Sequence, residues 1–186
     1  MAKHRILLDS NAYLRLANSF HPLLCNSFGQ ENYTLYLIPE FQKEFNKSTR
    51  LSKKFGWVDQ AEYIENRKHR LRILADDKKN IKIAYSYLWA QNRYEQLGAS
   101  PVDVRALAYG SILDVPVVTD DQDMTELAKQ FDIEIWGLID LLSIMLKAER
   151  ITKSDIKSLV SYLTYNKDLP YHSFKKRIKN EFKIIF

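Results

Sequence analysis

The chain has 186 residues and a formal net charge of +5, with 46% hydrophobic and 12% aromatic residues. This composition excludes an intrinsically disordered chain, because there is ample apolar surface to bury, and the length suits one domain with an appendage. The single cysteine, Cys25, excludes an internal disulfide framework and a cysteine-based zinc site.

The charge is distributed unevenly along the chain. Residues 42–82 hold twelve Lys and Arg against six Asp and Glu, and residues 150–186 hold nine against three. The rest of the chain has more acidic than basic side chains. Basic segments around an acidic centre suit a polyanionic partner, although Lys and Arg also decorate solvated helix faces in proteins without one.

The first hundred residues begin with two strand–helix pairs. The segment "RILLD" (5–9) predicts a short buried strand, and residues 10–17 have helical spacing. The segment "YTLYLIP" (33–39) predicts a second strand that its proline stops, and residues 40–48 turn helical.

Three helices are expected in the middle of the chain. Residues 61–77 and 83–97 carry apolar side chains at intervals of three and four. The next helix starts with clear punctuation, because Ser100 can cap it, Pro101 suits its first turn and Asp103 completes a capping box.

Two more strand–helix pairs follow. The segment "VPVVTD" (115–120) predicts a third strand, and residues 123–131 a helix with Asp123 as its cap. Residues 133–136 predict a fourth strand, leading into a helix over 138–149. Alternating strands and helices predict an α/β fold with a mostly parallel central sheet of about four to five strands and helices on both faces.

Residues 150–186 are expected to form a basic, helical C-terminal extension that packs on the same domain, which spans residues 1–149. Thr152 followed by Asp155 marks the start of one helix, and Phe174, Ile178 and Phe182 form an apolar stripe on another. Within the domain, residues 46–96 form a helical, basic middle segment.

Acidic residues follow the predicted strands. In a parallel α/β sheet, ligands bind at the carboxyl ends of the strands, so these carboxylates are expected to converge there. Clustered carboxylates need a counter-charge, and an all-oxygen ligand set suits Mg²⁺ or Mn²⁺. Each also has a structural interpretation when taken singly, as a helix cap or a solvated helix residue. The residues concerned are Asp9, Glu40, Glu44, Asp120, Asp121 and Asp123, together with Asp103 at the start of the helix that leads into the third strand.

The ordered set of motifs resembles the PIN-domain ribonucleases, a family that includes the toxins of many bacterial toxin–antitoxin pairs. The resemblance covers about residues 4–142. It rests on "ILLDSNAYL" with Asp9, "EFQKEF" with Glu44, "SPVDVRALAYG" with Asp103, and "VVTDDQD" with Thr119, Asp121 and Asp123.

The resemblance implies a PIN-like fold and an endoribonuclease that hydrolyses RNA phosphodiester bonds with water activated by Mg²⁺ or Mn²⁺. It implies catalytic, metal-binding roles for Asp9, Glu44, Asp103 and Asp121, with Asp123 as a further carboxylate at the metal. Asn11 and Thr119 would orient ligands or substrate. Asp120 stands where the family usually has Asn, and Glu40, one turn before Glu44, is the alternative second acidic ligand.

The basic segments are expected to hold the RNA backbone. The side chains assigned to this role are Arg67, Lys68, Arg70, Arg72, Lys175, Lys176 and Arg177. An antitoxin protein and a second copy of the chain are candidate partners. We expect no membrane partner. We expect a cytoplasmic location, because the apolar run at residues 6–8 is too short for a signal peptide.

Two other interpretations remain open. The chain could be a PIN-fold module that binds nucleic acid or a partner protein without cutting, or a toxin that an antitoxin holds inactive. The sequence leaves open the RNA target, the choice between RNA and DNA, and one or two metal ions.

Overall fold

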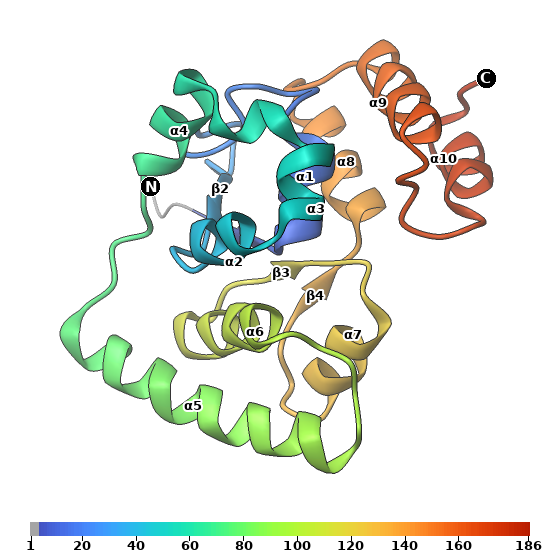
Figure 1. Cartoon of the computed structure of the whole chain (residues 1–186). Helices are drawn as coiled ribbons and strands as arrows, with labels where there is room; N and C mark the ends of the chain where they lie inside the picture. The colour runs from blue at the N-terminus through green and yellow to red at the C-terminus, as the bar shows by residue number, and fades with distance from the viewer. Residues whose placement is uncertain (1–3) are drawn as a thin grey trace.

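A four-stranded parallel sheet lies at the centre of the computed structural model, which describes residues 4–186 (Figure 1). The spatial order is β2-β1-β3-β4, and all three strand pairs are parallel. The strands are β1 (Arg5–Leu8), β2 (Thr34–Leu37), β3 (Val117–Val118) and β4 (Ile135–Trp136). The expected α/β class is therefore confirmed, with four strands in the sheet.

Ten α-helices and one 3₁₀ turn surround the sheet within the described residues. They are α1 (Ser10–Leu16), α2 (Phe41–Lys47), α3 (Thr49–Lys54), the 3₁₀ turn η1 (Gly56–Asp59), α4 (Ala61–Lys68), α5 (Ala75–Tyr94), α6 (Pro101–Leu113), α7 (Gln122–Lys129), α8 (Leu138–Lys147), α9 (Lys153–Tyr165) and α10 (Phe174–Phe182). Capping boxes at Ser100–Asp103 and Thr152–Asp155 start α6 and α9 as the sequence predicts.

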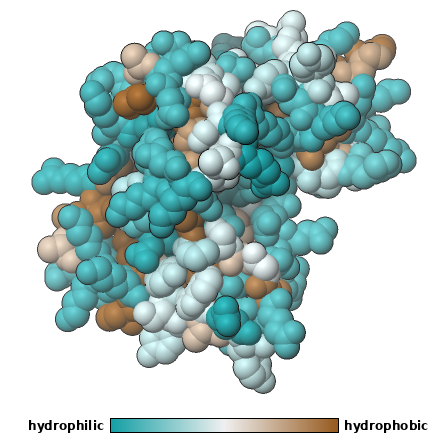
Figure 2. All heavy atoms as spheres, viewed as in Figure 1, coloured by the Kyte–Doolittle hydropathy of each residue, from teal (hydrophilic) through white to brown (hydrophobic). Residues whose placement is uncertain are grey.

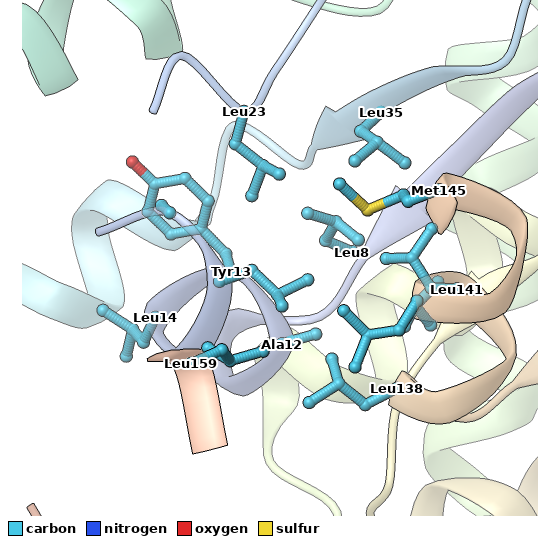
Figure 3. Packing of buried hydrophobic residues seen from close by; sticks show 14 of the residues in the cluster. Leu8, Ala12, Tyr13, Leu14, Leu23, Leu35, Leu138, Leu141, Met145 and Leu159 are labelled. Carbon is cyan, nitrogen blue, oxygen red and sulfur yellow. The ribbon is translucent and has the colours of Figure 1, made fainter. Parts of the chain in front are cut away.

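The two faces of the sheet carry separate hydrophobic clusters. Ile6, Leu8 and Val118 point to a cluster that includes side chains of α1, α8, α9 and α10 (Figure 3). Leu7 and Val117 point the other way, to a cluster formed with α5, α6 and α7. This alternation follows from the two-residue period of a strand. Because the central strands are buried on both faces, their consecutive residues are all apolar.

The C-terminal helices share the first of these clusters with the sheet. Phe174, Ile178 and Phe182 of α10 are buried in it, as the apolar stripe predicts, together with Ile156 and Leu159 of α9. In Figure 1 these two helices lie beside α8, at the opposite side of the sheet from α5.

The prediction of one continuous helix over residues 61–77 is wrong, because residues 69–74 interrupt it. Helix α4 ends at Lys68, residues 69–74 have no regular structure, and α5 begins at Ala75 rather than near residue 83. Leu71 and Ile73 pack against the second hydrophobic cluster, while Arg72 between them is exposed. An extended segment with alternating burial thus replaces the helix, because tertiary packing outweighs local propensity.

The surface is mostly hydrophilic on the face shown in Figure 2, where hydrophobic side chains occupy small separate areas. None of the helices within residues 4–186 is both long and apolar enough to pass through a membrane.

The close approach of α6 to β3 depends on Gly110. A Cβ atom placed there would lie 2.5 Å from Cγ2 of Val117 and 3.2 Å from the carbonyl oxygen of Val115. Gly110→Ala should therefore destabilise the protein by about 1–2 kcal/mol, the cost of overpacking less the gain in helix propensity. Denaturant unfolding measures this change.

Gly56→Ala is the matched control, because a Cβ at Gly56 would have no neighbour within 4 Å. It should leave the free energy of unfolding nearly unchanged. Equal effects of the two substitutions would contradict the packing of α6 on β3 described above.

Candidate functional site at the carboxyl edge of the sheet

Asp9 follows β1 and lies at the centre of the candidate site. Its side chain caps α1 by accepting a hydrogen bond from the backbone N–H of Ala12, and its other oxygen accepts one from the Thr119 hydroxyl. Only 2% of Asp9 is exposed. Burial raises the pKa of Asp9 to about 7, against the lowering effect of these two hydrogen bonds, and the charge of Asp103 raises it further.

Glu44 joins two chain segments that are distant in the sequence. Its Oε2 accepts a hydrogen bond from the Ser10 hydroxyl at 2.9 Å, and its Oε1 accepts one from the Ser100 hydroxyl at 3.4 Å. Ser10 directly follows Asp9, and Ser100 caps α6 in the capping box with Asp103. Glu44 therefore lies next to two of the other predicted carboxylates.

Asp103 is held at the first turn of α6. Its Oδ2 accepts a hydrogen bond from the backbone N–H of Ser100 at 3.0 Å. Burial raises the pKa of Asp103, the hydrogen bonds from Ser100 lower it, and the charges of Glu44 and Asp121 raise it further. Asp103 thus lies close enough to Asp9, Glu44 and Asp121 for their charges to repel, although the four come from separate segments of the chain.

Asp121 caps α7, and the predicted capping role of Asp123 is wrong. Asp121 Oδ1 accepts a hydrogen bond from Met124 N–H at 2.9 Å, and its own N–H donates to Thr119 Oγ1. Asp123 lies in the first turn and accepts a hydrogen bond from the Gly98 N–H at 2.9 Å instead. Both aspartates are good cap residues, and the loop before α6 needs an acceptor at Gly98, which Asp123 supplies.

Asp120 faces away from this cluster, toward the start of α8. Its Oδ1 accepts a hydrogen bond from the Leu138 N–H at 3.3 Å. Burial raises the pKa of Asp120, and the Leu138 N–H and the charges of Arg15 and Arg177 lower it. Asp120 thus lies close enough to Arg177 of the C-terminal extension for the two charges to attract.

The structure separates the two candidates for the second acidic position. Glu40 lies with its Oε1 3.7 Å from Nε of Arg105, and burial together with the charge of Glu40 raises the pKa of Tyr109 to about 12. Glu44 instead contacts the serines beside Asp9 and Asp103. The geometry therefore favours Glu44.

The other predicted residues have different surroundings. Thr119 is 2% exposed and bridges β1 and α7 through its hydroxyl, whereas Asn11 is exposed in the first turn of α1. Arg67 donates hydrogen bonds to Tyr13, Val58 and Gln42 within the protein. Exposed side chains make up the rest of the predicted RNA-binding set, namely Lys68, Arg70, Arg72, Lys175, Lys176 and Arg177.

Several polar residues of the site carried no recognisable signal in the sequence. Ser10 is an ordinary helix-start residue until Glu44 packs beside it. Arg15 contacts Asp168, which is 153 positions away in the chain. Only the folded structure reveals such contacts.

As the side chains stand, Asp9, Asp103 and Asp121 accept hydrogen bonds from backbone N–H groups at helix starts, and Glu44 accepts them from two serine hydroxyls. Among residues 4–186, no three Asp, Glu, His or Cys side chains are placed so that they could hold a metal ion together. No family model matches the chain, and no curated protein matches it.

The burial of Asp9 leads to a prediction about stability. Because the pKa of Asp9 in the folded state lies above its ordinary value, the protein is most stable with this group protonated. Stability is then lost as the pH rises through about 7. Asp9→Asn keeps a side chain that can cap α1 and removes the charge, so in EDTA at pH 8 it should raise Tm by roughly 3–8 °C.

The gain in Tm from Asp9→Asn should shrink as the pH falls toward the ordinary pKa of Asp9. Thermal unfolding of both proteins between pH 5 and pH 8.5 measures it. An Asp9→Asn protein that is less stable than the wild type at pH 8 would show that the charge is well compensated.

Proposed function

We propose that this protein is a metal-dependent endoribonuclease of the PIN type, which hydrolyses RNA phosphodiester bonds. The main support is that four carboxylates converge at one edge of the sheet, namely Asp9, Glu44, Asp103 and Asp121. Hydrogen bonds of the Ser10, Ser100 and Thr119 hydroxyl groups connect the segments that carry them.

The donor set is chemically suited to Mg²⁺ or Mn²⁺. All four side chains offer oxygen ligands, and within the described residues none of them makes an ion pair with Lys, Arg or His. Their charges therefore lack a direct neutralising partner. A bound divalent cation would supply that charge, polarise a phosphate oxygen and lower the pKa of a water molecule.

The protein's own groups have distinct tasks in this proposal. The Thr119 hydroxyl donates a hydrogen bond to the Asp9 carboxylate and accepts one from the Asp121 N–H. It therefore holds these two residues close together at the ends of β1 and β3. Glu44 keeps the starts of α1 and α6 together. The exposed Arg70 and Arg72, in the extended segment before α5, are available to hold the backbone of RNA.

The decisive experiment is cleavage of single-stranded RNA by the purified protein with Mn²⁺, with end-group analysis of the fragments. The products should carry 5′-phosphates. Asp9→Asn and Asp121→Asn should each lower the rate at least about 100-fold, because each removes a metal ligand while an Asn side chain can still cap its helix.

Asp114→Asn is the control for this experiment. Asp114 ends α6 in the left-handed conformation, which Asn also adopts, and it lines a cavity at the amino end of the strands. Its activity should equal that of the wild type. Cleavage that persists in both site variants would point to another site or a contaminant.

Metal binding is measured separately through stability. A cation that binds only the folded protein at about a hundredfold excess over Kd adds about 2.7 kcal/mol, or roughly 5–10 °C in Tm. Asp103→Asn should reduce this increment, and Asp114→Asn should not. RNA binding without a metal-induced shift and without cleavage would instead favour a non-catalytic binding module.

Toxin status is a further part of this proposal. An antitoxin would be expected to cover the carboxylate edge or α10, and co-expression with the product of a neighbouring small reading frame tests whether such a complex forms. A complex that leaves cleavage unchanged would contradict the toxin assignment.

A further inference from the structure

The C-terminal extension lies beside the carboxylate edge and forms a wall of the cleft there. An open cavity of about 610 Å³ is lined by Thr119, Asp120 and Gln122 on one side and by Tyr171, His172 and Arg177 on the other. A neighbouring cavity of about 360 Å³ has Asp121 and Asp123 in its lining, again with Tyr171. The extension therefore bounds the space that opens onto the candidate ligands.

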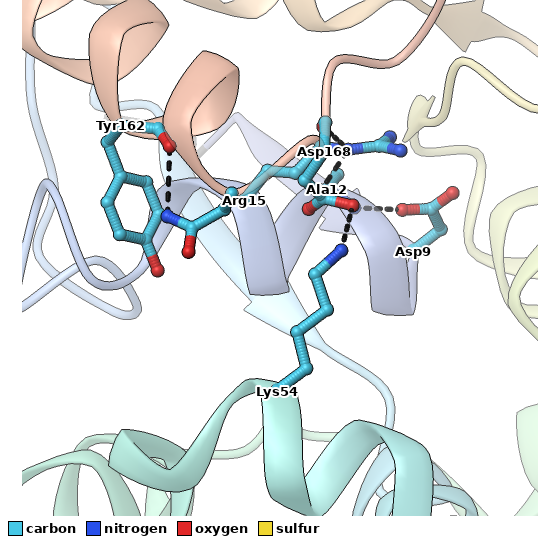
Figure 4. Close-up of polar contacts among 7 residues, drawn as sticks. Asp9, Ala12, Arg15, Lys54, Tyr162 and Asp168 are labelled. Atoms are coloured by element: carbon cyan, nitrogen blue, oxygen red, sulfur yellow. Dashed lines mark hydrogen bonds and ion pairs between the residues drawn. The ribbon is translucent and has the colours of Figure 1, made fainter.

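This wall is fastened to the body of the protein through Asp168. The Asp168 carboxylate lies 2.7 Å from Nζ of Lys54 on α3 and 3.8 Å from Nε of Arg15 on α1 (Figure 4). The same Nε donates a hydrogen bond to the Asp168 carbonyl oxygen at 3.1 Å. The Asp168 side chain is only 18% exposed, so these contacts fix the start of the wall.

Tyr171 and Arg177 form a pair on this wall. The Tyr171 ring packs edge-on against buried Phe174, with 5.5 Å between ring centroids. Arg177 Nη1 donates a hydrogen bond to the Tyr171 hydroxyl at 2.9 Å, and its guanidinium lies 5.6 Å from the ring centroid. These two contacts fix the orientation of the aromatic ring.

Arg177 is exposed, and the nearby charge of Asp120 attracts its guanidinium. Within residues 4–186, Arg177 makes no ion pair with a carboxylate, and its hydrogen-bond partner Tyr171 is a neutral hydroxyl. A guanidinium presents a planar fork of N–H donors that matches a phosphate group. The Tyr171 ring beside it offers a surface on which a base can stack.

We infer that Tyr171 and Arg177 form a nucleotide subsite, in which Arg177 binds a phosphate next to the cleaved bond and Tyr171 stacks on the adjoining base. This inference rests on the proposed function and makes the C-terminal extension part of the substrate site. The cavity lined by Arg177 and the one lined by Asp121 share Tyr171 in their lining, so a strand with its reacting phosphate at the carboxylates can reach this wall.

Binding of a fluorescent single-stranded oligoribonucleotide in EDTA, titrated over a range of salt concentrations, tests this subsite without requiring cleavage. Arg177→Gln should weaken binding and make the slope of log K against log salt shallower by about 0.7, the value for one lost phosphate contact on a single strand. Tyr171→Leu should weaken binding about tenfold without changing the slope, since stacking releases no counterions.

Two further variants separate this role from a structural one. Arg93→Gln removes the same charge from an exposed position on α5, and it should leave both affinity and slope at the wild-type values. Arg177→Lys keeps the charge but loses the fork, so the slope should be retained while affinity falls. Tm of each variant reports any loss of folding.

The outcomes also distinguish the two proposals. If the wild type cleaves RNA and Arg177→Gln binds with the wild-type slope and affinity, the subsite is overturned and the proposed function stands. If the wild type binds RNA with the expected effects at Arg177 and Tyr171 but never cleaves it, the subsite stands and the nuclease fails. A wild type that does not bind RNA at all overturns both.

Discussion

The hydrogen bond from the Thr119 hydroxyl to the buried carboxylate of Asp9 joins the two central strands at their carboxyl ends. Strand β3 is only two residues long, so few backbone hydrogen bonds secure it to β1. The side-chain contact extends the pairing by one residue, and the same Thr119 hydroxyl accepts the N–H of Asp121. A buried polar bridge of this kind therefore fixes both the register of the sheet and the start of α7.

The carboxylate cluster is tolerated because helices begin where it forms. Asp9, Asp103 and Asp121 each lie in the cap or first turn of a helix, and Asp120 accepts the N–H of Leu138 at the start of another. Unpaired N–H groups and the positive end of the helix dipole favour a carboxylate there. The fold thus gathers negative charge by using backbone donors in place of cationic side chains. The burial of Asp9 and Asp103 exceeds what these donors offset, since the pKa of each remains raised.

The sequence was most informative where a structural signal is local. The starts of α6 and α9 could be placed to the residue, because a capping box depends only on two side chains three positions apart. The fold class and the edge that carries the carboxylates followed from strand and helix periodicity.

Prediction failed where distant contacts decide between equivalent local choices. Leu71 and Ile73 fit both a helical and an extended segment, and the core under α5 selects the extended one. Asp121 and Asp123 could each cap α7, and the position of Gly98 separates them. Likewise, Glu40 and Glu44 differ by one helical turn in sequence, and only Ser10 and Ser100 show which of them faces Asp9 and Asp103.

The basic side chains show why a count of charge cannot assign binding residues. The guanidinium of Arg67 donates hydrogen bonds to Tyr13, Val58 and Gln42. Arg67 therefore stabilises contacts within the protein, although it lies in a basic segment. Lys175 lies over the ring of Phe186, two residues before Arg177 on the same helix. Of these three, only Arg177 lines the cavity that Asp120 also lines. Because a phosphate contact requires a cation placed beside the substrate, the location of Arg177 weighs more than the surplus of Lys and Arg around it.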